Sequence, residues 1–155
     1  MGGAMSGTTT SPVCVDAGIL VRLLTAQDDG TIRGLWGRWR EEGRSLIAPR
    51  LLRYAVTNAL HRLRGANRLS DELTQEALRS ALDLPVAIAD DADLHHHALA
   101  LAWRFGLPAA YDAHYLALAE REGAELWTTD RRLTNAVRHA FVWVHFVATP
   151  PSVTP

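Results

Sequence analysis

Three aspartates stand at positions where a parallel sheet would gather polar side chains. Asp16 ends the apolar run 12–15, and Asp130 follows the segment 126–129. Asp112 is expected in the early turns of a helix over 109–122, where its neighbours are alanine, tyrosine and leucine. Because sites in open parallel sheets form beyond the carboxyl ends of the strands, these three acids are the first candidates for a functional site.

Three carboxylates at one sheet edge repel each other unless a cation neutralises them. Their hard oxygen atoms suit Mg²⁺, or Mn²⁺ in its place. A Mg²⁺ ion held in this way keeps several waters and commonly binds phosphate, so phosphodiester cleavage is the expected reaction. Taken singly, each acid is equally well explained as a helix cap, because Asp is favoured at helix starts and gains from the helix dipole.

An arginine-rich segment supports a phosphate partner. The stretch 43–70 carries six arginines and no acid, namely Arg44, Arg50, Arg53, Arg62, Arg64 and Arg68. Guanidinium groups bind phosphate in a bidentate manner, so we expect Arg50, Arg53, Arg62 and Arg64 to contact a nucleic-acid backbone. The alternative is an ordinary solvated helix face.

Composition excludes several classes of protein. The chain has 155 residues, 48% of them hydrophobic, and a net charge of -1, so it is not a basic chain that coats nucleic acid through charge alone. All 16 cationic residues are arginines, which excludes P-loop hydrolases and Schiff-base enzymes that need a lysine. The single cysteine, Cys14, excludes a disulfide framework and fits a cytoplasmic protein. No apolar run is long enough for a membrane span.

Apolar runs alternate with segments of helical periodicity. This alternation predicts one three-layer α/β/α domain over 13–147, with a mostly parallel sheet of about five strands, a flexible leader at 1–12 and a flexible tail at 148–155. Strands are expected at 12–16, 45–48, 85–89, 125–128 and 141–147. Helices are expected at 17–25, around 32–39, at 52–65, 70–82, 94–105, 109–122 and 131–139.

Four segments of the chain resemble a known family. They span 13–22, 48–60, 110–120 and 126–133, and the Tyr-Asp-Ala block at 111–113 and the Thr-Thr-Asp block at 128–130 each carry several matching residues. In this order and spacing they resemble the PIN domain, and more narrowly the VapC-type toxins of toxin-antitoxin pairs. The resemblance implies a Mg²⁺-dependent endoribonuclease directed at single strands, usually a homodimer, which a VapB-type antitoxin inhibits by covering the site.

The resemblance also assigns roles to individual residues. It makes Asp16, Asp112 and Asp130 the acidic residues of the metal site and places Thr128 beside them. Asn58 agrees with the family pattern, whereas Ala55 stands where the family carries a glutamate. We therefore expect weaker metal binding and slower cleavage. The alanine fits either an inactivating Glu→Ala substitution, as used to express a lethal nuclease, or a natural loss of activity.

Two other functions remain as alternatives. The first is a catalytically silent PIN-fold module that still binds RNA or an antitoxin. The second is a phosphatase of the haloacid dehalogenase type, which is disfavoured because that chemistry needs a second aspartate where this chain has Gly18.

Several polar residues have ordinary structural explanations. The run His95, His96 and His97 is expected to be the solvated start of a helix rather than a metal site. His114 is expected at the rim of the site, where it could approach RNA. Asp28 and Asp29 beside Gly30 are typical of a turn.

Overall fold

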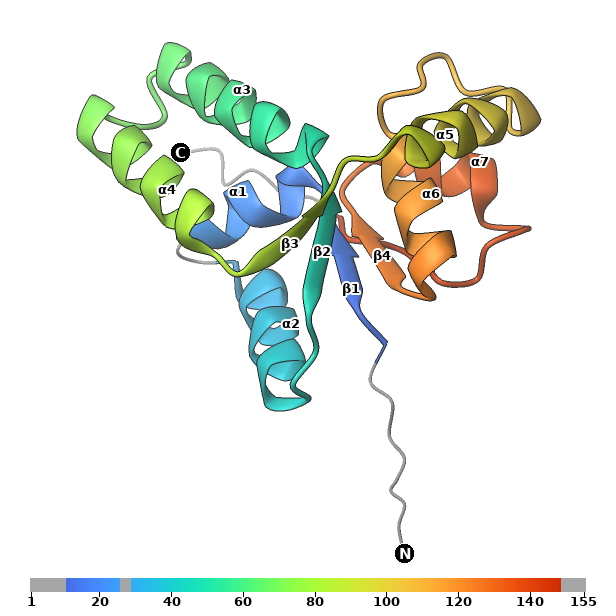
Figure 1. Ribbon diagram of the computed structural model, residues 1–155. Helices are drawn as coiled ribbons and strands as arrows, with labels where there is room; N and C mark the ends of the chain where they lie inside the picture. The colour runs from blue at the N-terminus through green and yellow to red at the C-terminus, as the bar shows by residue number, and fades with distance from the viewer. Residues whose placement is uncertain (1–10, 26–28, 149–155) are drawn as a thin grey trace, which may run out of the picture.

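A five-stranded sheet runs through the middle of the molecule, and every neighbouring pair of strands is parallel (Figure 1). The computed structural model describes residues 11–25 and 29–148. The strand order is β3-β2-β1-β4-β5. The strands are β1 (Val13–Val15), β2 (Leu46–Pro49), β3 (Val86–Ala89), β4 (Glu125–Thr128) and β5 (Val144–Phe146).

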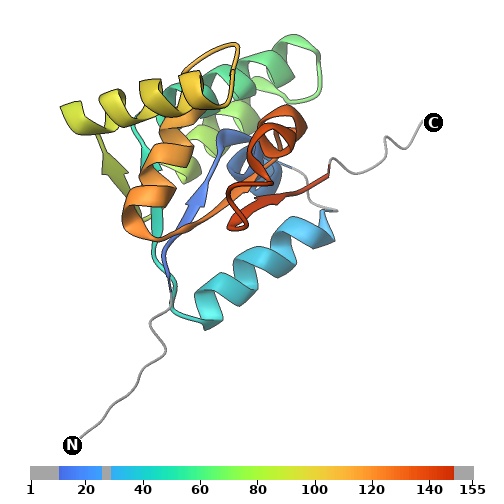
Figure 2. The ribbon, with the colours of Figure 1, turned by 90° about the vertical axis from the view of Figure 1, so that its right-hand side faces the viewer.

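Helices cover both faces of the sheet, as Figures 1 and 2 show. On one face lie α1 (Ala17–Thr25), α2 (Gly30–Glu41), α3 (Leu51–Gly65) and α4 (Asp71–Asp83). On the other face lie α5 (Ala92–Arg104), α6 (Ala113–Glu122) and α7 (Arg131–Val137). The predicted three-layer α/β/α architecture is confirmed, and within the described residues no helix is long and apolar enough to cross a membrane.

The central strand explains why the sheet is parallel and covered on both sides. All three residues of β1, Val13, Cys14 and Val15, are completely buried. A continuous apolar run, rather than an alternating one, is typical of a parallel strand with helices on both faces. Because all the strands point the same way, their carboxyl ends meet at one edge, where Asp16 follows β1 and Asp130 follows β4.

The expected leader and tail lie mostly outside the described residues. The described end of the leader is held in place: Arg44 donates a hydrogen bond of 2.9 Å to the Ser11 carbonyl, and the amide of Glu125 donates one of 3.2 Å to the Pro12 carbonyl. Of the tail, only Ala148 is described.

One helix starts later than its sequence indicates. The alanines at 109 and 110 predict helix, but α6 begins at Ala113. The chain enters this region through Gly106, whose φ is +62°, and then reaches Pro108. The amide of His114 bonds the carbonyl of Tyr111 at 3.2 Å, three residues back, so the chain turns tightly before the helix begins. Asp112 therefore stands at the N-cap position rather than inside the helix.

A buried ion pair joins α1 to α2. Arg22 Nε donates to Asp29 Oδ2 at 2.7 Å, and the Asp29 side chain is only 2% exposed. The other Asp29 oxygen accepts a hydrogen bond from the amide of Ile32 and caps α2. Burial opposes ionisation of Asp29, but the hydrogen bonds from Arg22 and Ile32 outweigh it and lower the pKa of this carboxyl. The residue expected in an ordinary turn is thus part of the core, while Asp28 lies outside the described residues.

We predict that Asp29→Asn lowers the free energy of unfolding by about 3 kcal/mol at pH 7, because it leaves the Arg22 guanidinium buried without its counter-charge. Because the pKa of Asp29 is lower in the folded chain than in the unfolded chain, its stabilising effect is present above the unfolded pKa and is lost on acidification. The difference in unfolding free energy between the native chain and Asp29→Asn should therefore shrink below about pH 4. Urea unfolding measures both effects. The control is Asp71→Asn, which removes an exposed partner of Arg64 and should cost less than about 1 kcal/mol. Equal losses in the two variants would contradict the prediction.

Candidate active site at the carboxyl edge of the sheet

Asp16 is the most firmly held acid of the site. Its Oδ2 accepts hydrogen bonds from the Thr128 hydroxyl at 2.6 Å and from the Thr129 amide at 2.9 Å. Its Oδ1 accepts one from the Ile19 amide at 3.0 Å, which satisfies the first turn of α1. Burial nevertheless raises the pKa of Asp16 against the opposing effect of these hydrogen bonds. The residue that ends β1 is thereby fixed to the end of β4.

Thr128 connects two of the three acids. It is completely buried, its hydroxyl donates to Asp16, and its hydroxyl oxygen accepts from the Asp130 amide at 3.0 Å. Asp130 in turn caps α7, because its Oδ1 accepts from the Leu133 amide at 3.1 Å. The capping explanation is therefore correct for Asp16 and Asp130, and it holds together with their place in a cluster.

Asp112 is the third acid, and it makes no capping hydrogen bond. Burial, a hydrogen bond to Asp130 and the negative charges of Asp130 and Asp16 raise the pKa of Asp112 to about 6. Every contribution to this pKa acts in the same direction, and none comes from a cation. The structure thus brings the three predicted acids, from three distant parts of the sequence, within electrostatic reach of one another.

The chemistry of these three carboxylates fits a divalent cation. Within residues 11–25 and 29–148, no group of three or more His, Cys, Asp or Glu side chains is placed to hold a metal ion. The carboxylate oxygens at this edge are the ligands that Mg²⁺ prefers. The buried hydroxyl of Tyr115 has no hydrogen-bond partner within the described chain. Burial is the main cause of its raised pKa, and the negative charges of Asp16 and Asp112 raise it further. An unsatisfied donor beside uncompensated acids is consistent with a hydrated ion there.

A glycine permits the close packing around Asp16. A Cβ atom on Gly18 would come within 2.1 Å of the Thr129 Oγ1, far inside van der Waals contact. Thr129 is the residue whose amide holds Asp16. No side chain fits at position 18 without displacing Thr129, which agrees with the rejection of a phosphatase that needs an aspartate there.

The predicted residues on α3 divide into different environments. Ala55 is half-buried and packs against the core, on the same side as the buried Leu52 and Val56. Asn58 is exposed one turn later. Position 55, where the family resemblance predicts a glutamate, thus carries a methyl group on the half-buried side of α3.

The arginine-rich segment does not form one patch. Arg44 lies before β2, at the opposite end of the sheet from the acids, and pairs with Glu125 at 2.7 Å. Arg50 lies at the carboxyl edge and pairs with Asp90 at 2.8 Å. Arg53, Arg62 and Arg64 are exposed along α3, where Arg62 lies 12 residues beyond Arg50, or roughly 18 Å at the rise of an α-helix. Of the predicted RNA contacts, Arg50 is thus the one at the sheet edge itself.

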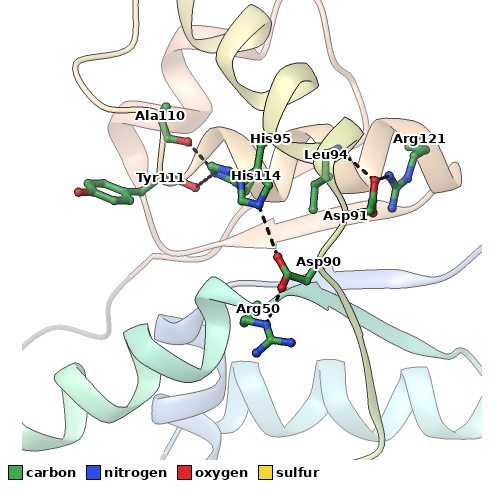
Figure 3. Close-up of polar contacts among 9 residues, drawn as sticks. All are labelled: Arg50, Asp90, Asp91, Leu94, His95, Ala110, Tyr111, His114 and Arg121. Carbon is green, nitrogen blue, oxygen red and sulfur yellow. Dashed lines mark hydrogen bonds and ion pairs between the residues drawn. The ribbon is translucent and has the colours of Figure 1, made fainter.

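A chain of polar contacts beside the acids was not expected from the sequence (Figure 3). Asp90 contacts Arg50 and lies 3.4 Å from His95 Nε2, and His95 Nδ1 lies 2.9 Å from His114 Nε2. The Nδ1–H of His114 donates to the carbonyls of Ala110 and Tyr111, at 2.9 and 3.0 Å. These contacts join the residue before α3, the residue after β3, the helix α5 and the start of α6 to the loop 107–112. His95 and His114 are 19 residues apart, so helical spacing gave no sign of the pair.

Comparison with known proteins identifies the chain's relatives. Residues 13–138 match the PIN domain family. The structure is similar to that of PAE2754 from Pyrobaculum aerophilum, with 28% sequence identity and a TM-score of 0.62 over 84% of this chain and 90% of that chain. It also resembles VapC20 of Mycobacterium tuberculosis, a Sarcin-Ricin loop cleaving toxin, with 20% identity and a TM-score of 0.60 over 86% of this chain and 98% of that one. No curated protein matches the sequence.

We predict that Asp112→Asn stabilises the chain at pH 7.5 in the presence of a chelator. A raised pKa means that the folded chain binds the proton more tightly, so stability falls as the pH rises from about 4 through 6. The variant escapes this loss and should be more stable by about 1 kcal/mol at pH 7.5, allowing for solvent screening, with little difference at pH 4.

Urea unfolding at the two pH values measures this difference, with the exposed acid variant Glu76→Gln on α4 as the control. Added Mg²⁺ should raise the melting temperature of the native chain more than that of Asp112→Asn, because it binds only the folded state. A gain that is equally large at pH 4, or a Mg²⁺ effect of the same size in both chains, would contradict the clustering of the acids.

We also predict that Gly18→Ala lowers the free energy of unfolding, although alanine favours the helix α1 in which it would stand. Alanine favours helix, but here its Cβ must displace Thr129 and weaken the contacts of Asp16. We expect a loss of about 1–3 kcal/mol in unfolding free energy. The matched control is Gly34→Ala on α2, where the added Cβ meets nothing within 4 Å and should be neutral or stabilising. Similar stability in both variants would show that Thr129 moves freely.

Proposed function

Since the chain belongs to the PIN domain family, we propose that it is a metal-dependent endoribonuclease of the VapC type, impaired by the alanine at position 55. The observation that carries this proposal is the convergence of Asp16, Asp112 and Asp130 at one sheet edge, where no cationic side chain of the described residues lowers the pKa of Asp16 or of Asp112. Such a cluster destabilises the folded chain and persists in proteins mainly where it has a function.

The three aspartates would hold a Mg²⁺ or Mn²⁺ ion. When bound, such an ion supplies a water of lowered pKa and neutralises the charge that develops on a phosphate. The remaining work falls to the chain itself. Thr128 and Thr129 fix the rotamer of Asp16, Gly18 leaves room for Thr129, and Asp130 is fixed by the first turn of α7. These outer contacts hold the acids in place before any ligand arrives.

Ala55 accounts for the expected weakness of the site. Helix α3 starts directly beyond the carboxyl end of β2, so position 55 lies about one turn from the edge where the acids gather. A methyl group offers no oxygen to a metal ion or to a water. Among the described residues, the three aspartates also do not form a group that is placed to hold a metal ion.

The alanine at position 55 and the lack of a metal-ligand group among the described residues also favour a second candidate, a PIN-fold module that binds RNA or an antitoxin without cleaving. A glutamate at position 55 should raise RNA cleavage if the chain is an impaired nuclease, and should leave cleavage unchanged if the chain is a silent module. An RNA substrate is supported by Arg50 at the edge of the site and by the likeness to VapC20, a toxin that cleaves the Sarcin-Ricin loop.

We further propose a VapB-type antitoxin and a homodimer, as the VapC resemblance implies. Relief, by a co-expressed VapB-type protein, of the growth arrest that Ala55→Glu is expected to cause would support the first. The mass of the purified chain in solution would decide the second.

We predict that Ala55→Glu raises the rate of RNA cleavage with Mg²⁺ by about 10- to 100-fold, because it returns a carboxylate to the site. Cleavage of a labelled single-stranded RNA measures the rate, and growth arrest on expression is a second readout. The matched control is Ala59→Glu, which adds the same charge one turn further along α3 and should have little effect.

Adding Asp112→Asn to Ala55→Glu should abolish the regained cleavage. No gain from Ala55→Glu in cleavage or growth arrest would favour the silent module. Full activity in the double variant would remove Asp112 from the site.

A further inference from the structure

Beside the acidic cluster lies a hollow of about 330 Å³ between the start of α3 and the loop 107–112, which we call the α3–loop hollow. Its apolar surface includes the buried side chains of Pro49 and Leu94, together with the half-buried Leu51. Its polar groups come from the contact chain shown in Figure 3, in which Arg50, Asp90 and the two histidines take part. An apolar hollow with a few converging polar groups is the usual form of a small ligand site.

Two exposed aromatic rings border this hollow. Tyr54 on α3 is 66% exposed, and Tyr111 in the loop is 70% exposed. Tyr54 stands four residues after Arg50, so the two side chains share one face of the helix. Large aromatic side chains left in water beside a site commonly provide binding surface, and flat rings of this kind stack on nucleobases.

The hollow adjoins the proposed reaction centre. Tyr111 directly precedes Asp112, and Arg50 lies between the end of β2 and the helix that carries Ala55. A nucleotide strand with one phosphate at the acids would therefore bring a neighbouring base to the hollow. The Arg50 side chain is 59% exposed despite its ion pair, so it remains accessible to a phosphate.

The hollow is held open by its own contacts. His114 bonds the carbonyls of Ala110 and Tyr111 and thereby fixes the loop, while His95 and Asp90 join it to Arg50. A site whose walls are fixed in advance loses less entropy when it binds a ligand.

We propose that the α3–loop hollow binds one unpaired base of the RNA strand, stacked against Tyr54 and Tyr111, next to the phosphate at the acidic cluster. The proposal rests on the proposed function, because it takes RNA as the substrate. A base fits better than an aliphatic peptide side chain, since its apolar faces meet tyrosine rings while its polar edge meets arginine, aspartate and histidine groups. Base-paired RNA would be excluded, because its bases are not free to leave the stack.

The test measures binding without cleavage. A five-nucleotide single-stranded RNA with 2-aminopurine at one position is titrated with the native chain in a buffer that contains Ca²⁺ in place of Mg²⁺, so that a cation offsets the charge of the acids. Stacking should quench the 2-aminopurine fluorescence at one position of the oligonucleotide. Tyr54→Ala and Tyr111→Ala should each remove the quenching and weaken binding about tenfold, whereas the Phe variants should bind like the native chain.

Two controls separate stacking from other effects. Trp103→Ala removes an exposed aromatic side chain on α5 that does not border the hollow, and it should change nothing. An RNA that lacks the base at the quenched position should bind the native chain about tenfold more weakly, but should bind Tyr54→Ala no more weakly than the intact RNA does.

The outcomes distinguish this proposal from the nuclease function. If Ala55→Glu cleaves RNA while the tyrosine variants bind it normally, the base site is wrong and the nuclease stands. If quenching occurs but Ala55→Glu never cleaves, the base site stands alone. If the tyrosine variants change the mass of the chain in solution and leave RNA affinity unaltered, the hollow is a contact between copies of this chain and the proposal is overturned.

Discussion

Asp16 is the residue on which the site depends, because its carboxylate joins the ends of two neighbouring strands. Four donors from Thr128, Thr129 and Ile19 surround it, and through Thr128 it is connected to Asp130. A carboxylate so enclosed cannot rotate, which is what a preorganised site requires. The same enclosure raises its pKa, so the geometry is maintained against an electrostatic cost.

Asp29, which is buried, and Asp112, which is only partly removed from water, are two acids of this chain in opposite electrostatic surroundings. Asp29 has a cationic partner in Arg22 and a lowered pKa, and it stabilises the packing of α1 against α2. Asp112 has acids for neighbours and a raised pKa. An acid with a cationic partner stabilises the fold, whereas neighbouring acids without one lower its stability, and a bound cation would offset that loss. This contrast within one small domain is the physical basis for assigning structure to one acid and function to the other.

A chain of polar contacts lies beside the acids and borders the α3–loop hollow, where we propose that a base binds. The contacts from Arg50 through Asp90, His95 and His114 join elements on both faces of the sheet. They stand beside the loop that carries Asp112, so the acids and the α3–loop hollow share one set of supports. A rigid edge of this kind can hold a phosphate and a base at a fixed separation, which is how positioning contributes to catalysis.

The sequence by itself determined the fold class, and it singled out the three acids as candidates for the site. Buried runs such as Val13–Val15 alternate with helical periodicity, and this dictates parallel strands whose carboxyl ends share an edge. Asp16 and Asp130 could therefore be selected from local pattern alone. The pattern failed at the start of α6, because the propensity of two alanines was overridden by Gly106, Pro108 and a tight turn.

Tertiary structure decided what distant residues do to each other. The dispersal of the arginines, the burial of Asp29 and the meeting of His95 with His114 depend on contacts between segments far apart in the chain or on which face of an element turns inward. Gly18 shows the same limit, since only the approach of Thr129 explains why no side chain fits there. Local periodicity records which residues are buried or capped, but the partner of a charge is fixed only when the chain has folded.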